Sequence, residues 1–171
     1  MATATTPRGY RYQDTLVGTP NNPVLHIQQL AEDIDTDVQA LADRVATVHG
    51  PDDTYPNTTT ATSSEVVHNR ITIPAATYAR IVDVSATLHL TYSAAGNVDS
   101  LLYADAAALH RVRVVQAAAA IEHHQLGAKV AVAAGDGVVI EARFYRTSGA
   151  GTVTPSTAAG FSAMSATAIP A

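Results

Sequence analysis

The side chains that could do chemistry in this sequence are mainly its seven histidines, since the chain contains no cysteine. His123 and His124 are adjacent, so in a strand they would point to opposite faces and could not bind one metal ion together. His89 and His110 lie in different predicted strands and could meet across a sheet, where Glu122 or Asp83 could add a carboxylate ligand. Exposed or hydrogen-bonded histidines are the favoured interpretation, so we expect neither a metal site nor a cofactor.

A second candidate is a cluster of arginines. Arg111 and Arg113 alternate with Val112 and Val114, which places both guanidinium groups on one face of a predicted strand. Arg143, in a later predicted strand, could lie near them. We expect a solvated face or a face of salt bridges between subunits; binding of an anionic ligand is the alternative.

No catalytic motif accompanies these residues. The segment AAGDGV lacks the lysine and the following Ser or Thr of a phosphate-binding loop, and the chain contains neither GxGxxG nor GxSxG. Asp52 and Asp53 are adjacent, but they lie in a segment rich in Ser, Thr, Asp and Pro, which predicts a linker. We therefore expect that the protein is not an enzyme.

The composition limits the partners and the location of the protein. Its net charge of −5 disfavours nucleic acid as a partner. No apolar stretch approaches the length of a membrane span and the N-terminus lacks a signal-peptide core, so we expect no membrane partner and synthesis in the cytoplasm. Hydrophobic residues make up 47% of the chain but aromatic residues only 5%, so a core of small side chains would gain buried area from association between subunits.

The strongest local pattern predicts a helix over residues 23–49. Asn22 and Pro23 suit the N-cap and the first helical position, and Gly50 suits the C-terminal cap. Between these residues, apolar side chains recur in two series that each repeat every seven residues. The positions of this seam are Ile27, Ala31, Ile34, Val38, Leu41, Val45 and Val48.

A seam with this spacing predicts a coiled coil. β-Branched residues occur in both series and favour three strands over two, so we expect a homotrimer with these positions at its interface. A single amphipathic helix that packs on its own domain is the alternative.

Residues 1–22 contain little that could form a core, because two prolines and two glycines interrupt the segment. We interpret the segment as an extended attachment arm that a partner orders; the alternative is a flexible terminus. Its larger side chains include arginine and tyrosine, which are typical anchors of protein interfaces. These side chains are Arg8, Tyr10, Arg11, Tyr12, Leu16 and Val17.

Beyond a linker at residues 50–64, the apolar period changes to two. We expect a mainly β protein in which residues 65–171 form an antiparallel β-sandwich of jelly-roll type. Residues 117–126 fit either a helical turn or the end of a strand. The predicted strands are 66–73, 79–92, 98–103, 109–116, 128–133, 138–147 and 161–169.

Three segments carry a resemblance to known proteins. Residues 7–12 (PRGYRY) and 27–35 (IQQLAEDID) resemble the N-termini of small virion proteins of tailed phages that infect actinobacteria. Residues 161–169 (FSAMSATAI) are similar to the last strand of trimeric phage-fibre and C1q/TNF-like jelly rolls. Such virion proteins are described as capsid decoration, head-fibre or minor tail proteins, and no catalytic residue comes with either resemblance.

The resemblance implies a structural role in a virion. The arm would dock on the major capsid protein or on another virion protein, the helix would trimerise, and the β domain would face outward. A capsid decoration or head-fibre protein is the leading expectation. A minor tail protein, or a module of the tail that binds a receptor or a host-surface glycan, is the alternative.

Overall fold

The computed structural model describes residues 3–5, 11–13, 23–42, 45–52, 61–156 and 162–171 of the chain. The chain divides into two compact units, Met1–Val45 and Ala46–Ala171. Among the described residues, no helix combines the length and the apolar character that crossing a membrane requires.

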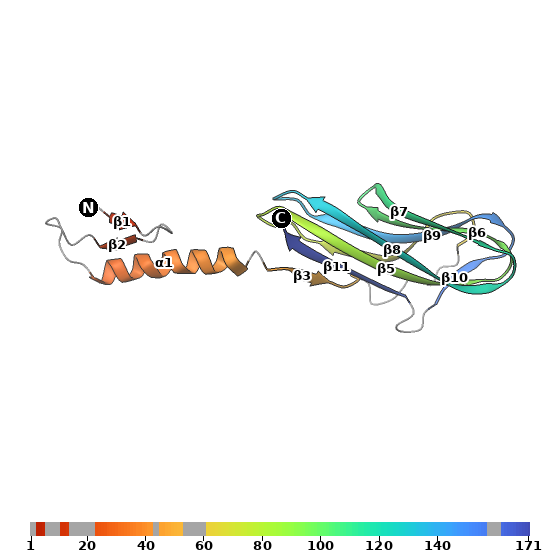
Figure 1. Ribbon diagram of the computed structural model, residues 1–171, viewed down its shortest axis with the longest axis horizontal. Coiled ribbons are helices and arrows are strands. Elements are labelled where there is room, and N and C mark those ends of the chain that lie inside the picture. The colour runs from red at the N-terminus through yellow and green to blue at the C-terminus, as the bar shows by residue number, and fades with distance from the viewer. Residues whose placement is uncertain (1–2, 6–10, 14–22, 43–44, 53–60, 157–161) are drawn as a thin grey trace. The chain divides into compact units, whose positions relative to one another are not determined.

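The first unit contains a pair of short strands and one helix (Figure 1). β1 (Thr3–Thr5) and β2 (Arg11–Gln13) pair antiparallel, and β2 lies beside α1 (Pro23–Ala42). Residues 1–22 therefore do not form a single extended arm, because backbone hydrogen bonds join the two strands. Pro7 and Gly9, which lie between these strands in the sequence, are residue types that favour reversals of the chain.

The second unit is built from antiparallel strands that are joined mostly by short connections. Its strands are β3 (Thr47–His49), β4 (Val66–Ile73), β5 (Arg80–Tyr92), β6 (Gly96–Ala104), β7 (Ala107–Gln116), β8 (Ala120–Val132), β9 (Val138–Gly149), β10 (Val153–Pro155) and β11 (Ala163–Pro170).

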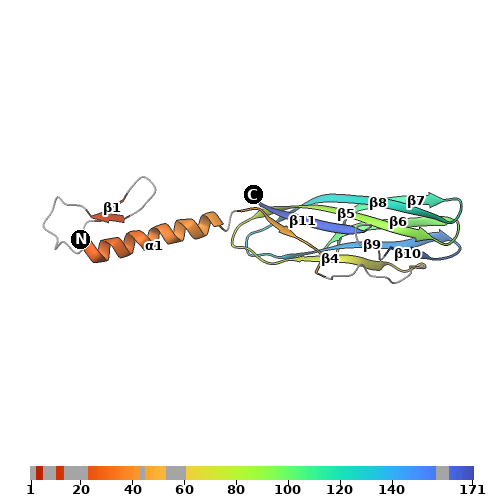
Figure 2. The ribbon, with the colours of Figure 1, turned by 90° about the horizontal axis from the view of Figure 1, so that it is seen from below.

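These strands form two sheets that lie face to face (Figures 1 and 2). One sheet has the order β4-β9-β6-β7. In the other sheet, β5 pairs along one edge with β8 and along its opposite edge with β11 and β10, and β11 in turn pairs with β3. The predicted mainly β chain with an antiparallel sandwich is confirmed.

The core lies between the two sheets and follows the period of two. In β5, Val82, Val84, Leu88 and Leu90 are buried, and most of the residues between them point to the outer face. Phe144 of β9 is the largest fully buried side chain. Several core positions hold alanine, and such small side chains let the sheets approach closely. These positions are Ala86, Ala142, Ala166 and Ala168.

The helix is shorter than its sequence pattern predicts, because it ends at Ala42 and not at residue 49. Val48 lies in β3, opposite Thr167 of β11, so its predicted place in a helical seam is wrong. Thr47 and Val48 are β-branched and suit an edge strand, and pairing with β11 satisfies backbone groups that a helix would otherwise satisfy. Val45 also lies beyond the last helical residue.

The β unit begins earlier than residue 65 and includes part of the predicted linker. Ala61 is fully buried and forms two backbone hydrogen bonds with Val153 of β10. β8 begins at Ala120, so most of residues 117–126 are strand, and the strand predicted at 128–133 is only its second half. β3 and β10, with three residues each, are too short to show a period of two.

Candidate functional site

The structure offers two candidate surfaces, one on each unit. On the first unit it is the apolar stripe of α1. On the second unit it is the arginine face, which we define as the outer surface of the sheet β4-β9-β6-β7. The charged residues of the arginine face are Arg70, Asp99, Arg111, Arg113, Glu141 and Arg143.

The apolar stripe consists of the predicted seam residues that are helical, namely Ile27, Ala31, Ile34, Val38 and Leu41. All five are exposed in the single chain, and Ile27 and Leu41 are 67% and 69% exposed. A row of exposed apolar side chains on one helix is a candidate surface for a partner. Val45 and Val48 are exposed too, but they lie outside the helix.

The predicted attachment residues are only partly described. Arg11 and Tyr12 lie in β2, where they pair with Thr5 and Ala4 of β1. The other four, Arg8, Tyr10, Leu16 and Val17, lie outside the described residues.

The first centre of the arginine face is Asp99 on β6, whose side chain is 0% exposed. Arg113 donates two hydrogen bonds to it, from Nε to Oδ1 at 2.6 Å and from Nη2 to Oδ2 at 2.9 Å. Arg111 Nη2 and Tyr145 Oη also donate to Oδ2, the latter at 3.3 Å. The register explains this cluster, because Asp99 lies opposite Arg113 on β7 and opposite Tyr145 on β9.

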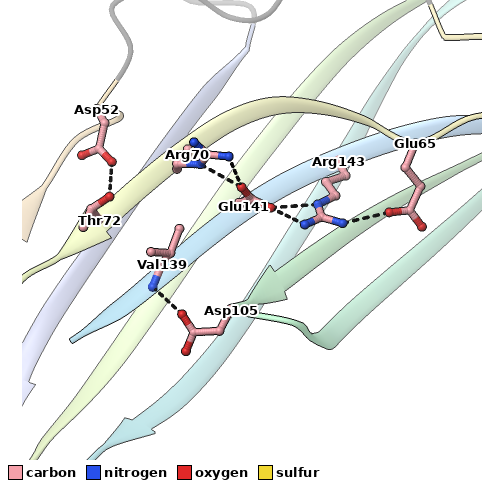
Figure 3. A network of polar contacts seen from close by, with 8 residues as sticks. All are labelled: Asp52, Glu65, Arg70, Thr72, Asp105, Val139, Glu141 and Arg143. Carbon is pink, nitrogen blue, oxygen red and sulfur yellow. Dashed lines mark hydrogen bonds and ion pairs between the residues drawn. The ribbon is translucent and has the colours of Figure 1, made fainter. Parts of the chain in front are cut away.

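The second centre is Glu141 on β9, which lies between two arginines (Figure 3). Arg70 Nε donates to Glu141 Oε1 at 2.8 Å, and Arg143 Nε donates to Oε2 at 2.9 Å. Arg143 Nη1 also donates to Glu65 at 3.1 Å, and its guanidinium carbon lies 4.3 Å from the centre of the Tyr103 ring. Arg143 thus joins an ion pair to a cation–π contact, which fixes a long side chain in one orientation.

Two further carboxylates lie at one end of this sheet and tie its loops to strands. Asp52 accepts a hydrogen bond of 2.5 Å from Thr72 Oγ1, and Asp105 accepts one of 3.0 Å from the Val139 amide (Figure 3). Asp105 has a φ of 51°, a left-handed conformation that aspartate tolerates better than most residues and that suits the short turn between β6 and β7.

The arginines control the charge state of both centres. Hydrogen bonds from Arg113 and Arg111 hold the pKa of Asp99 below its usual range, although burial acts in the opposite direction. Burial alone would raise the pKa of Glu141, but hydrogen bonds from Arg143 and Arg70 outweigh it and lower the pKa. Both carboxylates are therefore ionised at neutral pH. Carboxylates held in this way are poor proton carriers near neutral pH.

A serine and a histidine form a hydrogen bond in the core, as the two residues of a catalytic dyad would. Ser100 Oγ lies 2.6 Å from His124 Nδ1, and Tyr92 Oη lies 2.8 Å from His124 Nε2. All three residues are almost completely buried, so no substrate can reach the serine hydroxyl. The cluster instead links β6 of one sheet to β5 and β8 of the other. Burial lowers the pKa of His124 to about 4, so this ring is neutral at pH 7.

The structure separates the other histidines considered as metal ligands. His89 stacks on His123 with 4.3 Å between ring centres, whereas His110 Nδ1 lies 3.1 Å from the Gly127 amide nitrogen. His89 on β5 and His110 on β7 belong to different sheets, and their rings contact different residues. Among the described residues, no group of three or more His, Asp or Glu side chains could hold a metal ion.

The comparison with known proteins gives no relative from which a function could be taken. No protein-family model matches this chain, and no curated protein sequence matches it.

The sequence predicts part of the arginine face. It places Arg111 and Arg113 on one face, but it expects solvent or salt bridges between subunits there, whereas both residues form salt bridges within the chain. It misses Asp99 and Glu141, which are the acceptors. Each is a lone carboxylate in an apolar strand, in VDSLL and VVIEA, and a charge at such a position requires a partner.

Proposed function

We propose that this chain is a non-enzymatic structural protein of a phage virion and that it assembles as a homotrimer. The apolar stripe of α1 is the observation that carries this proposal. The first unit attaches the protein to the major capsid protein or to another virion protein, and the β unit faces outward. A capsid decoration or head-fibre role is the leading form of the proposal.

The stripe supports self-association by its spacing. Ile27, Ile34 and Leu41 are seven residues apart, and Ala31 and Val38 form the second series of the same seam. α1 carries acidic side chains and no Lys or Arg, so the polar flanks of three helices would stay in solvent. With Ile at two positions of one series and Val in the other, three strands are favoured over two.

The topology of the β unit supports a virion role more weakly. If the three-residue β10 is set aside, the orders β3-β11-β5-β8 and β4-β9-β6-β7 match the arrangement that a jelly roll would have, with two four-stranded sheets that exchange strands along the chain. Jelly rolls occur in viral capsid proteins, but also in lectins and cupins, so the fold alone does not select a function.

The decisive experiment measures the mass of the full chain in solution. We expect a trimer for the wild type and a monomer for Ile34→Asp combined with Leu41→Asp, because two carboxylates in each helix would have to be buried in the seam. The matched control is Gln28→Asp combined with Thr36→Asp, which adds the same charge at exposed positions off the stripe and should stay trimeric.

The outcomes separate assembly from attachment. A monomeric wild type contradicts the homotrimer, and a trimer that persists in Ile34→Asp combined with Leu41→Asp contradicts the apolar stripe as its interface. Cosedimentation with phage heads and with phage tails then tests the virion role independently of the oligomeric state. Binding to neither particle contradicts the virion role.

A second candidate function is a minor tail protein or tail module that binds a receptor or a glycan. The arginine face favours this candidate, because it presents charged and aromatic groups on a rigid sheet without any catalytic arrangement. The two candidates differ in which surface of the protein is essential.

A further inference from the structure

The arginine face has a positive end. Around Asp99, two arginines surround one carboxylate, which leaves a local charge of +1. Around Glu141, the charges of Arg70 and Arg143 are balanced by Glu141 and Glu65. The positive end is therefore the row that contains Asp99, in a chain whose net charge is −5.

Two further negative groups, Asp52 and Asp105, lie at the opposite end of this sheet, near Val139. Asp105 bonds to Val139 of β9, whereas Asp99 lies opposite Tyr145, six residues further along that strand. At the rise of an extended strand this separation is roughly 20 Å, about two Debye lengths at physiological salt. The carboxylates near Val139 therefore cancel little of the positive charge near Asp99.

The guanidinium groups at the positive end keep donors available for a ligand. Among the described residues, the Arg111 side chain makes its only hydrogen bond through Nη2, and Arg113 uses Nε and Nη2. Both side chains are 49% exposed, although the carboxylate that they hold is buried. Asp99 thus acts as an anchor beneath two oriented donors, and an oxyanion above them would accept charge-assisted hydrogen bonds.

The neighbouring side chains extend this surface across the sheet. Leu101 lies opposite Arg111 on β7 and opposite Arg143 on β9, so the two arginines are two strand spacings apart, roughly 10 Å. Arg143 rests on Tyr103, and Tyr145 completes the row of Asp99. Positive groups and tyrosines thus alternate across the face.

This chemistry favours a hydrated acidic polymer over a protein or a nucleic acid. The centre of a protein interface is usually apolar and poor in charge, whereas here the apolar side chain at the centre, Leu101, is only 6% exposed between arginines. A nucleic acid requires a broad basic surface, which a local charge of +1 in an acidic protein does not supply. A polysaccharide with spaced oxyanions needs only a few arginines, with tyrosine rings for the sugar rings to pack against.

We propose that the arginine face, at Arg111, Arg113, Arg143, Tyr103 and Tyr145, binds a polysaccharide that carries carboxylate or sulfate groups. The proposal deepens the second candidate function and does not depend on trimerisation.

The experiment measures binding of the full chain to immobilised polygalacturonate, dextran sulfate and neutral dextran. We expect binding to at least one acidic polymer, no binding to neutral dextran, and an affinity that falls as salt is raised. Arg111→Gln should weaken the affinity about tenfold, since it removes one charged donor while Arg113 still holds Asp99. Arg70→Gln, in the balanced cluster, should weaken it less.

The matched control is Lys129→Gln, which removes the same charge from the outer face of the other sheet, where Lys129 is 71% exposed. Its affinity should equal that of the wild type. Absence of binding to both acidic polymers, unchanged binding by Arg111→Gln, or an equal loss in Lys129→Gln would overturn the proposal. Equal or tighter binding to polyglutamate would also overturn it, and would assign the face to an acidic protein.

Two further measurements distinguish a failure of the polysaccharide proposal from a failure of the trimer proposal. Unfolding midpoints of Arg111→Gln and Lys129→Gln within a few degrees of the wild type confirm that the loss is local. The mass in solution tests the trimer in the same samples, so a failure of polysaccharide binding leaves that result unaffected.

Discussion

The two outer faces of the sandwich are both formed by antiparallel strands, but they differ in how their charged side chains are paired and buried. On the arginine face, ion pairs hold two buried carboxylates under four guanidinium groups. The outer face of the other sheet, here called the plain face, combines small polar side chains such as Ser85, Thr87, Ser165 and Thr167 with three exposed isoleucines along β5, β8 and β11. Its ion pair among the described residues, Lys129 with Asp83, spans 3.4 Å and is open to solvent.

The difference between these faces shows where a charge contributes to stability. A carboxylate that is removed from water must be paired, and loss of its partners leaves an expensive buried charge. An exposed pair gains little, because water and salt screen it. The fold therefore depends on charges on one face and hardly on those of the other.

The largest expected effect comes from Asp99→Asn. It removes the charge that holds Arg111 and Arg113 together, and we expect the free energy of unfolding to fall by about 2 to 4 kcal/mol. Asp83→Asn, which makes the same chemical change on the plain face, should lower it by less than about 1 kcal/mol. Urea denaturation of both variants measures the difference. Similar losses in the two variants would mean that the faces do not differ in this respect.

A smaller loss of stability is expected on acidification, because His124 in the core between the two faces becomes protonated. The pKa of His124 is lowered to about 4 in the folded protein from 6.5, so the unfolded chain binds more protons between these values. Stability should therefore decrease as pH falls from about 6.5 to about 4, by about 2 to 3 kcal/mol, and the contribution of His124 should then level off.

The same titration separates the core from the arginine face. The pKa of Asp99 is lowered, so its contribution is present above its unfolded pKa, near 4, and is lost only below that value as pH falls through the folded pKa. In His124→Gln the loss between pH 6.5 and 4 should be much smaller, while the steep loss below pH 4 remains. A wild-type curve that is flat from pH 6.5 to 4 would argue against a buried neutral His124.

The sequence allowed prediction of the sandwich but not of the ionic network. The alternation at Val82, Val84, Leu88 and Leu90 predicts both a strand and the face of it that is buried, because the apolar residues that recur at every second position are those that face the core. The pairing of Asp99 with Arg113 depends on which strands become neighbours and in which register, and the sequence pattern does not contain that information.

The predicted end of the helix, at residue 49, was wrong for a related reason. The seam continues in the sequence to Val45 and Val48, so periodicity alone extends the helix to residue 49. Pairing of β3 with β11 is a contact between residues more than 100 positions apart, and this tertiary contact overrides the local pattern. The three-residue strands β3 and β10 are not predicted from the sequence either, because they too depend on pairing with strands that are distant along the chain.

The smallest expected effect is that of Lys129→Gln on the plain face. Lys129 is 71% exposed and Asp83 is 46% exposed, so their attraction is weak and partly offset by the entropy lost in holding two side chains together. We expect the free energy of unfolding to change by less than about 0.5 kcal/mol, with little dependence on salt between 50 mM and 500 mM by urea denaturation. Asp99→Asn gives the contrast, since a buried pair is screened much less. A loss above 1 kcal/mol in Lys129→Gln would mean that the plain face also relies on fixed charge, and exposure alone would then be a poor guide to which ion pairs stabilise this sandwich.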